Sequence, residues 1–174
     1  MFKSIVIAFD GSAHATRALE IGALLASRDQ VPLGVIYVID TQHMAMPGGL
    51  RQFAESEHLL EPVSMMSINF ESAPADVMHT MAENAAKSER AMHQFADYMI
   101  EQARRVAGEA GVEAVETVIV DGNPAKEIIA FAKARGADLI VIGSRGFGAL
   151  KSLALGSISN KVAQLADCTC LTVK

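Results

Sequence analysis

Three glycines and a serine near the C-terminus have the spacing of a phosphate-binding loop. Gly143 and Gly146 follow the apolar run 139–142, and after nine further residues Gly156 and Ser157 open a helix-like stretch. Glycine lets the backbone approach a ligand closely, and unpaired N–H groups at the start of a helix point at an anion. The sequence therefore predicts binding of a nucleotide or of another phosphorylated small molecule.

One carboxylate and two basic side chains stand close to such a site. Asp10 directly follows the first strand-like run and could hold a ribose hydroxyl or a metal ion bound to phosphates. His14 and Arg145 each admit two interpretations, as solvent-exposed residues or as phosphate contacts. No second acid, nucleophile or arginine finger accompanies Asp10, so the residues favour binding with at most slow hydrolysis.

Several other phosphate and catalytic motifs are absent. The P-loop requires glycine directly before its Lys-Ser pair, whereas Leu150 precedes Lys151 and Ser152. The turn at residues 10–14 lacks the G-x-G-x-x-G pattern of a dinucleotide-binding enzyme. Neither the G-x-S-x-G turn of α/β-hydrolases nor a C-x-x-C or H-E-x-x-H pattern occurs, which disfavours those classes.

Alternating strand-like and helix-like runs must position these residues. The first four strand-like runs are rich in Val and Ile with little alternation, which is typical of parallel strands buried on both faces. Asn123 and Pro124 form a helix start, with Asn as the N-cap and Pro at the first helical position. The alternation predicts βαβ units and a parallel α/β sheet. The predicted strands are residues 4–9, 33–39, 115–120, 138–142 and 169–173.

Polar residues and glycines follow each of the first four predicted strands. Right-handed crossovers bring these strand ends to one edge of the sheet, where open α/β sheets bind ligands. Turn chemistry alone would explain any one of them, whereas four together with the glycine spacing favour a shared crevice. The segments concerned are 10–12, 40–41, 121–123 and 143–144.

The middle of the chain differs from the rest. Residues 41–74 contain three of the five prolines and show no clear period, so we expect a long insert that serves as a lid, a binding loop or a disordered segment. A helix is predicted over 75–109, and its methionines recur at steps of three and four residues. They suit flexible core filling, with a groove for a protein partner as the alternative.

Composition limits the class of protein. The 174 residues suit a single domain, and a hydrophobic fraction of 51% is enough for a full core. A net charge of −5 argues against nucleic acid as a partner. No apolar run approaches the ~18 residues that span a bilayer, and no signal peptide is recognised, so we expect a cytoplasmic protein without a membrane partner.

The glycine and serine spacing resembles the ATP-binding signature of the universal stress protein family. Segments 5–12, 142–146 and 155–162 are also similar to that family. The resemblance covers residues 1–40 and 112–174. Since the chain keeps the glycines, it resembles the ATP-binding branch. The resemblance implies an open five-stranded parallel sheet of order 3-2-1-4-5 with helices on both faces, of the adenine nucleotide alpha-hydrolase-like type, and a homodimer paired through the last strand.

The resemblance also implies the nucleotide contacts. Asp10 would lie near the ribose and a metal ion carried by the phosphates, Mg²⁺ or Mn²⁺. The backbone of Val38 would meet the adenine of ATP, or of AMP or ADP, and Ser159 would be a further donor. The full implied set is Ala8, Phe9, Asp10, Val38, Ile142, Gly143, Gly146, Gly156, Ser157, Ile158 and Ser159.

Three functions remain open at this point. The first is an ATP-binding regulator in the stress response, in which the nucleotide shifts an equilibrium between loop conformations. The second is a slow metal-dependent ATPase that uses Asp10. The third is an interaction module, independent of nucleotide, that works through residues 41–110 and an unknown protein partner.

The glycine spacing makes one prediction about substitutions. A β-branched side chain at Gly143 or Gly156 should block the backbone approach and abolish nucleotide affinity. It should leave the fold intact if these glycines do not need positive φ.

Overall fold

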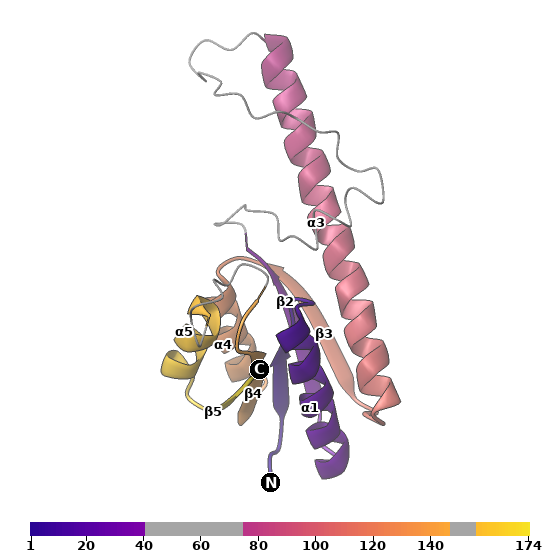
Figure 1. Cartoon of the computed structure of the whole chain (residues 1–174), viewed down its shortest axis with the longest axis vertical. Coiled ribbons are helices and arrows are strands. Elements are labelled where there is room, and N and C mark those ends of the chain that lie inside the picture. Colours follow the sequence, from indigo (N-terminus) through magenta and orange to yellow (C-terminus); the bar gives the residue numbers. More distant parts are fainter. Residues whose placement is uncertain (41–74, 147–155) are drawn as a thin grey trace. The chain divides into compact units, whose positions relative to one another are not determined.

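The computed structural model describes residues 1–40, 75–146 and 156–174, and the predicted insert at 41–74 lies outside them. The chain divides into two compact units, 1–45 with 96–174, and 46–95. All the strands belong to the first unit (Figure 1). The elements are β1 (Ile5–Ala8), α1 (Ala13–Asp29), β2 (Leu33–Ile39), α3 (Ala75–Glu109), β3 (Val115–Asp121), α4 (Pro124–Ala134), β4 (Leu139–Gly143), α5 (Ser157–Leu165) and β5 (Thr169–Val173).

The five strands form one parallel sheet in the order β3-β2-β1-β4-β5, so the expected order and all five expected strands are confirmed. β1 is central, with Ile5 opposite Leu33 on β2 and Leu139 on β4. Every residue of β1 and β4 is buried, which is why these runs are continuously apolar. The strand order reverses between β1 and β4.

Helices cover both faces of the sheet (Figure 1). Val6 and Ala8 point to one face and join a core cluster with α4 and α5. Ile7 points to the other face, where α1 approaches so closely that a side chain at Gly22 would meet its Cδ1 at 2.7 Å. The buried residues of α1 are Ala15, Ala18, Leu19, Gly22, Ala23 and Ala26.

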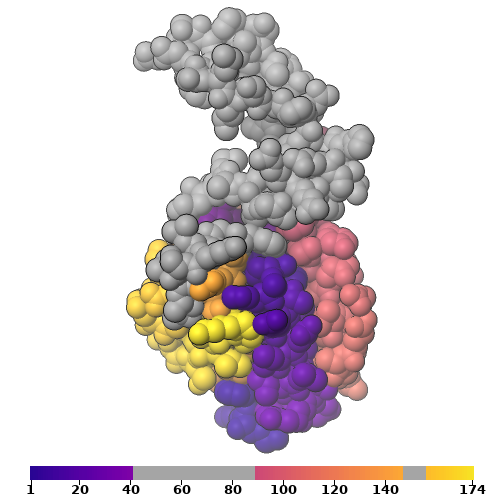
Figure 2. Space-filling model, in the orientation of Figure 1, coloured from indigo at the N-terminus to yellow at the C-terminus, as the bar shows by residue number. Residues whose placement is uncertain are grey.

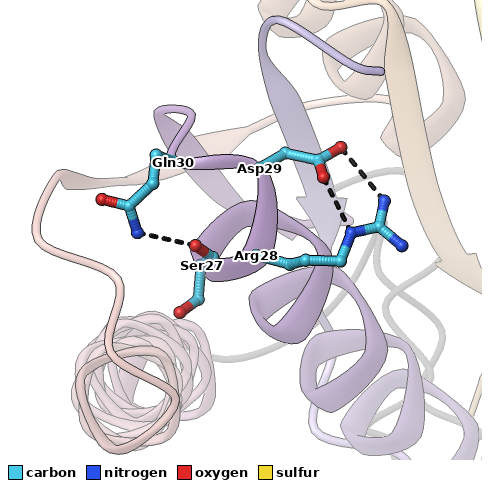
Figure 3. Close-up of polar contacts among 4 residues, drawn as sticks. All are labelled: Ser27, Arg28, Asp29 and Gln30. Atoms are coloured by element: carbon cyan, nitrogen blue, oxygen red, sulfur yellow. Dashed lines mark hydrogen bonds and ion pairs between the residues drawn. The ribbon is translucent and has the colours of Figure 1, made fainter.

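Capping fixes where the helices begin and end. Ser12 is the N-cap of α1 and Asn123 that of α4, as the Asn-Pro pair predicts. At the end of α1, Gln30 takes the left-handed conformation and its side-chain amide donates to the Ser27 carbonyl at 2.7 Å (Figure 3). The predicted long helix is confirmed as α3, and its segment 96–109 belongs to the sheet-bearing unit.

The C-terminus lies beside α1 (Figure 2). Arg17 on α1 donates to the carbonyl of Lys174 at 3.1 Å. β5 is the edge strand next to β4, and Leu171 on it is 36% exposed. Among the described residues, we find no helix with the length and apolar character needed to cross a bilayer.

Candidate functional site

The carboxyl ends of β1 and β4 lie side by side. Ala8 is the register partner of Ile142, so the segments that follow the two strands start from neighbouring points. One leads to Asp10 and the start of α1, and the other leads to residues 144–146. This edge is where the strand order reverses, which is the usual place for a ligand in an open α/β sheet.

Asp10 is a largely buried acid at this edge. Its Oδ1 accepts a hydrogen bond from the Ser12 N–H at 2.9 Å. Burial raises the pKa of the carboxyl, although hydrogen bonds from Ser12 and the charge of His14 act in the opposite direction. Burial, together with Asp10, also raises the pKa of the Tyr37 phenol. Asp10 is therefore an acid held in a poorly solvated position.

Gly146 passes directly over this carboxyl. A Cβ on Gly146 would lie 2.5 Å from Asp10 Oδ2, closer than any ordinary contact. Since the φ of Gly146 is not positive, the effect of a side chain here would be to displace the Asp10 carboxylate.

Ser144 connects the end of β4 to two other elements. Its carbonyl accepts from the Gly156 N–H at 2.7 Å and from the Ser159 hydroxyl at 3.0 Å, which attaches the start of α5. Its own N–H donates to the Val173 carbonyl on β5 at 2.6 Å. Ser144 is only 1% exposed, so the segment between the glycines is anchored in the core.

The first turn of α1 holds the same segment from the other side. Ser12 Oγ donates to the Arg145 carbonyl at 3.2 Å. His14 Nδ1 lies 2.9 Å from Ser144 Oγ. Gly143 packs against the backbone of this turn, because an added Cβ would meet Ala15 N at 2.7 Å and His14 C at 2.8 Å. The N-termini of α1 and α5 thus both meet residues 143–145.

The structure brings most of the predicted site residues to this edge. Asp10, Gly143, Gly146 and Gly156 are joined through the contacts just described. Ala8 and Phe9 lie at the end of β1, Ile142 at the end of β4 and Ser157 at the start of α5. Val38 lies on β2 with its side chain packed against the core cluster.

Two neighbouring residues of α5 differ in solvent exposure. Ile158 is 40% exposed, whereas Ser159 is 3% exposed. The Ser159 hydroxyl is within 3.0 Å of both the Ser144 and Gly156 carbonyls. It therefore stabilises the start of α5 within the protein.

Sequence reasoning placed Ser12 and Ser144 in segments that follow strands but assigned no contact to either, and it left His14 undecided. Ser12 carries the signal of an N-cap, a polar residue just before an apolar-periodic run, so it could have been found. The sequence does not show which contacts Ser144 makes, because they depend on three elements that meet only in the fold.

Asp10 could contribute one ligand to a metal ion that arrives together with phosphates. Among the described residues, no group of three or more His, Cys, Asp and Glu side chains is arranged to bind a metal. Mg²⁺ is commonly bound through one or two carboxylates together with substrate phosphates. Asp10 can supply one such carboxylate.

A separate hollow of about 620 Å³ opens at the opposite edge of the sheet, with Lys3, Phe131 and Arg135 in its lining. Arg135 pairs with Glu116 and lies over the Phe131 ring. The glycine-rich segment and Asp10 are absent from its lining. This hollow is therefore separate from the edge where β1 and β4 end.

Comparison with known proteins agrees with the fold and the spacing. The sequence model of the universal stress protein family matches residues 1–174. "Universal stress protein YxiE" of Bacillus subtilis is 32% identical over 174 residues, which is all of both chains. A universal stress protein of Thermus aquaticus is 32% identical over 178 residues, again covering both chains completely.

Solved structures share the fold. The structure of the hypothetical protein MJ0577 has a TM-score of 0.69 at 24% identity and covers 100% of this chain and 96% of its own. A universal stress protein in complex with cAMP has a TM-score of 0.63 at 21% identity, with coverages of 99% and 97%. The universal stress protein of Archaeoglobus fulgidus in complex with dAMP has a TM-score of 0.58 at 20% identity, with coverages of 99% and 98%.

Proposed function

Because the chain belongs to the universal stress protein family, we propose that it binds an adenine nucleotide, with ATP foremost, at the edge where β1 and β4 end. We further propose that the whole chain, 1–174, is one domain of this family. It would act in the cytoplasm as a nucleotide-dependent regulator of the stress response, with little or slow hydrolysis. The cAMP and dAMP complexes of two structural relatives support an adenine ligand.

One observation carries the proposal. The backbone between Gly143 and Gly146 is fixed by α1, α5 and β5, while the two glycines have no space for a side chain. A backbone segment anchored beside two helix N-termini leaves the N–H groups at the start of those helices suited to hold phosphate oxygens. The residues implied by the family resemblance lie around the same edge.

The same geometry favours binding over rapid hydrolysis. Asp10 could complete the coordination of Mg²⁺ or Mn²⁺ bound to the phosphates, and the metal would then neutralise phosphate charge. Fast phosphoryl transfer needs, in addition, a residue that positions the attacking water. Among the described residues at this edge, we assign no such residue.

We also propose that two copies pair through β5. β5 is an edge strand whose backbone groups on one side are free of strand partners in the described sheet. Thr169 and Leu171 on it are exposed, and an exposed edge strand is suited to pair with another strand.

The direct test is to identify small molecules released when freshly purified protein is denatured, followed by calorimetric titration with ATP and magnesium. Co-purified ATP, ADP or AMP, or binding in the micromolar range, would support the proposal. If no nucleotide is released and no heat of binding is measured, the proposal is refuted and attention moves to residues 41–110.

We expect Asp10→Asn to raise the melting temperature at pH 7 and to weaken Mg-ATP binding about tenfold through loss of one charged ligand. The folded-state pKa of Asp10 is raised above 3.8, so ionisation costs stability as the pH rises from that value to the folded-state pKa. The amide keeps an acceptor for Ser12 without the charge.

Melting curves of both proteins between pH 3 and pH 8 test this. The stability gain of Asp10→Asn should be absent in strong acid and should develop as the pH rises. A variant that melts below the wild type at pH 7 would show that the carboxylate stabilises the fold instead.

A further inference from the structure

The hydroxyl of Ser144 has a single hydrogen-bond partner among the described residues, Nδ1 of His14 at 2.9 Å. Ser144 is 1% exposed, so its O–H cannot turn to bulk water. A buried hydroxyl that fails to donate loses a hydrogen bond and carries the cost of its desolvation. Ser144 Oγ–H therefore donates to Nδ1.

This bond determines which ring nitrogen of His14 carries the proton. When Nδ1 of a neutral imidazole accepts, the proton resides on Nε2, which becomes a donor. His14 thus presents an N–H donor and needs no charge to bind an anion.

The ring is close to the backbone that the phosphates would approach. Its Nδ1 contacts the residue after Gly143, and its own backbone and Cβ lie against Gly143. The carbonyl of that same residue, Ser144, receives the N–H of Gly156 at the start of α5. Among the described residues, Nε2 of His14 has no hydrogen-bond partner, and the side chain is only partly buried.

We propose that His14 is a specificity-determining residue that donates its Nε2–H to a phosphate oxygen, and that Ser144 is the positioning residue that fixes this tautomer. The inference rests on the proposed function, because it assigns a contact within the same nucleotide site. The Nε2–H donor of His14 makes the site favour phosphorylated adenine ligands over adenosine. Asp10, the charged group that interacts with His14 across this edge, would be screened from the phosphates by a bound metal ion.

Ligand series measured by calorimetry in the presence of magnesium test the proposal. Adenosine, AMP, ADP and ATP would be titrated into the wild type, His14→Ala, His14→Gln and Ser144→Ala. We expect His14→Ala to lose about tenfold in affinity for the three nucleotides and less than about twofold for adenosine. His14→Gln, whose amide retains a donor, should recover part of the loss, and Ser144→Ala should lose about threefold with the same ligand dependence.

Nitrogen-15 spectra of the imidazole test the tautomer without any nucleotide. The wild type should show a protonated Nε2 and an unprotonated Nδ1, and Ser144→Ala should show a mixture. A protonated Nδ1 in the wild type would overturn the proposal. An equal loss for adenosine and for ATP in His14→Ala would also overturn it, since the ring would then be structural.

These arms separate the two proposals. If the wild type binds no adenine ligand, the nucleotide function fails and the role of His14 fails with it, whatever the spectra show. If nucleotides bind and His14→Ala binds all of them as the wild type does, only the role of His14 is wrong.

Discussion

Gly143→Ala is expected to lower the free energy of unfolding by about 2 kcal/mol, which corresponds to a melting temperature lower by ~4–8 °C in a chain of this size. The added Cβ would lie 2.7 Å from Ala15 N and 2.8 Å from His14 C. Both are backbone atoms in the first turn of α1, so no side-chain rotation can relieve the clash. The helix start must move away from β4.

Gly156→Ala is the matched comparison. Its Cβ would lie 3.3 Å from the Ser144 carbonyl oxygen, so a small adjustment accommodates it. We expect a cost below about 1 kcal/mol, as for an N-cap exchange. Thermal melts of the two variants check the ranking, and equal melting temperatures would show that α1 does not pack on Gly143 in solution.

This result would correct one expectation from the sequence. The sequence-based prediction makes an intact fold depend on the sign of φ, and neither Gly143 nor Gly156 has positive φ. For Gly143 the geometry predicts a loss of stability for a different reason, which is the close contact between two backbones. A glycine can be required by its neighbours as strictly as by its own dihedral angles.

Gly146→Val is expected to weaken ATP binding about 30-fold while changing the melting temperature little. Gly146 is exposed, so the fold does not depend on packing there. Its Cβ would lie 2.5 Å from Asp10 Oδ2, and either the carboxylate or the backbone must be displaced. Loss of one charge-assisted contact costs about 1.5–3 kcal/mol, or roughly tenfold to a hundredfold in affinity.

Gly108→Ala provides the control for this experiment. Gly108 lies in α3, and an added Cβ there has no neighbour within 4 Å. We expect unchanged ATP affinity and a gain of about 0.5–1 kcal/mol from helix propensity. Calorimetric titration of wild type, Gly146→Val and Gly108→Ala with ATP decides the matter, and wild-type affinity in Gly146→Val would refute the assignment of the site.

Much of the fold follows from local sequence patterns. Buried apolar runs separated by helical periods predict a parallel α/β sheet, because a strand with both faces covered needs apolar side chains on both. The Asn-Pro pair predicts the start of α4 for an equally local reason, since it satisfies the first free N–H groups of the helix. The strand order came from the family resemblance, and the sheet confirms it.

Some features of the site likewise follow from the sequence, and others depend on the tertiary structure. The sequence by itself determined the glycine spacing and the acid after β1, because backbone freedom and charge belong to single residues. Only the tertiary structure decided that Gly143 lies against α1, that Gly146 covers Asp10 and that Ser144 joins His14, α5 and β5. The contacts of Gly143, Gly146 and Ser144 with residues 10–15 link positions about 130 apart, and a local pattern carries no record of which distant atoms will share one buried space.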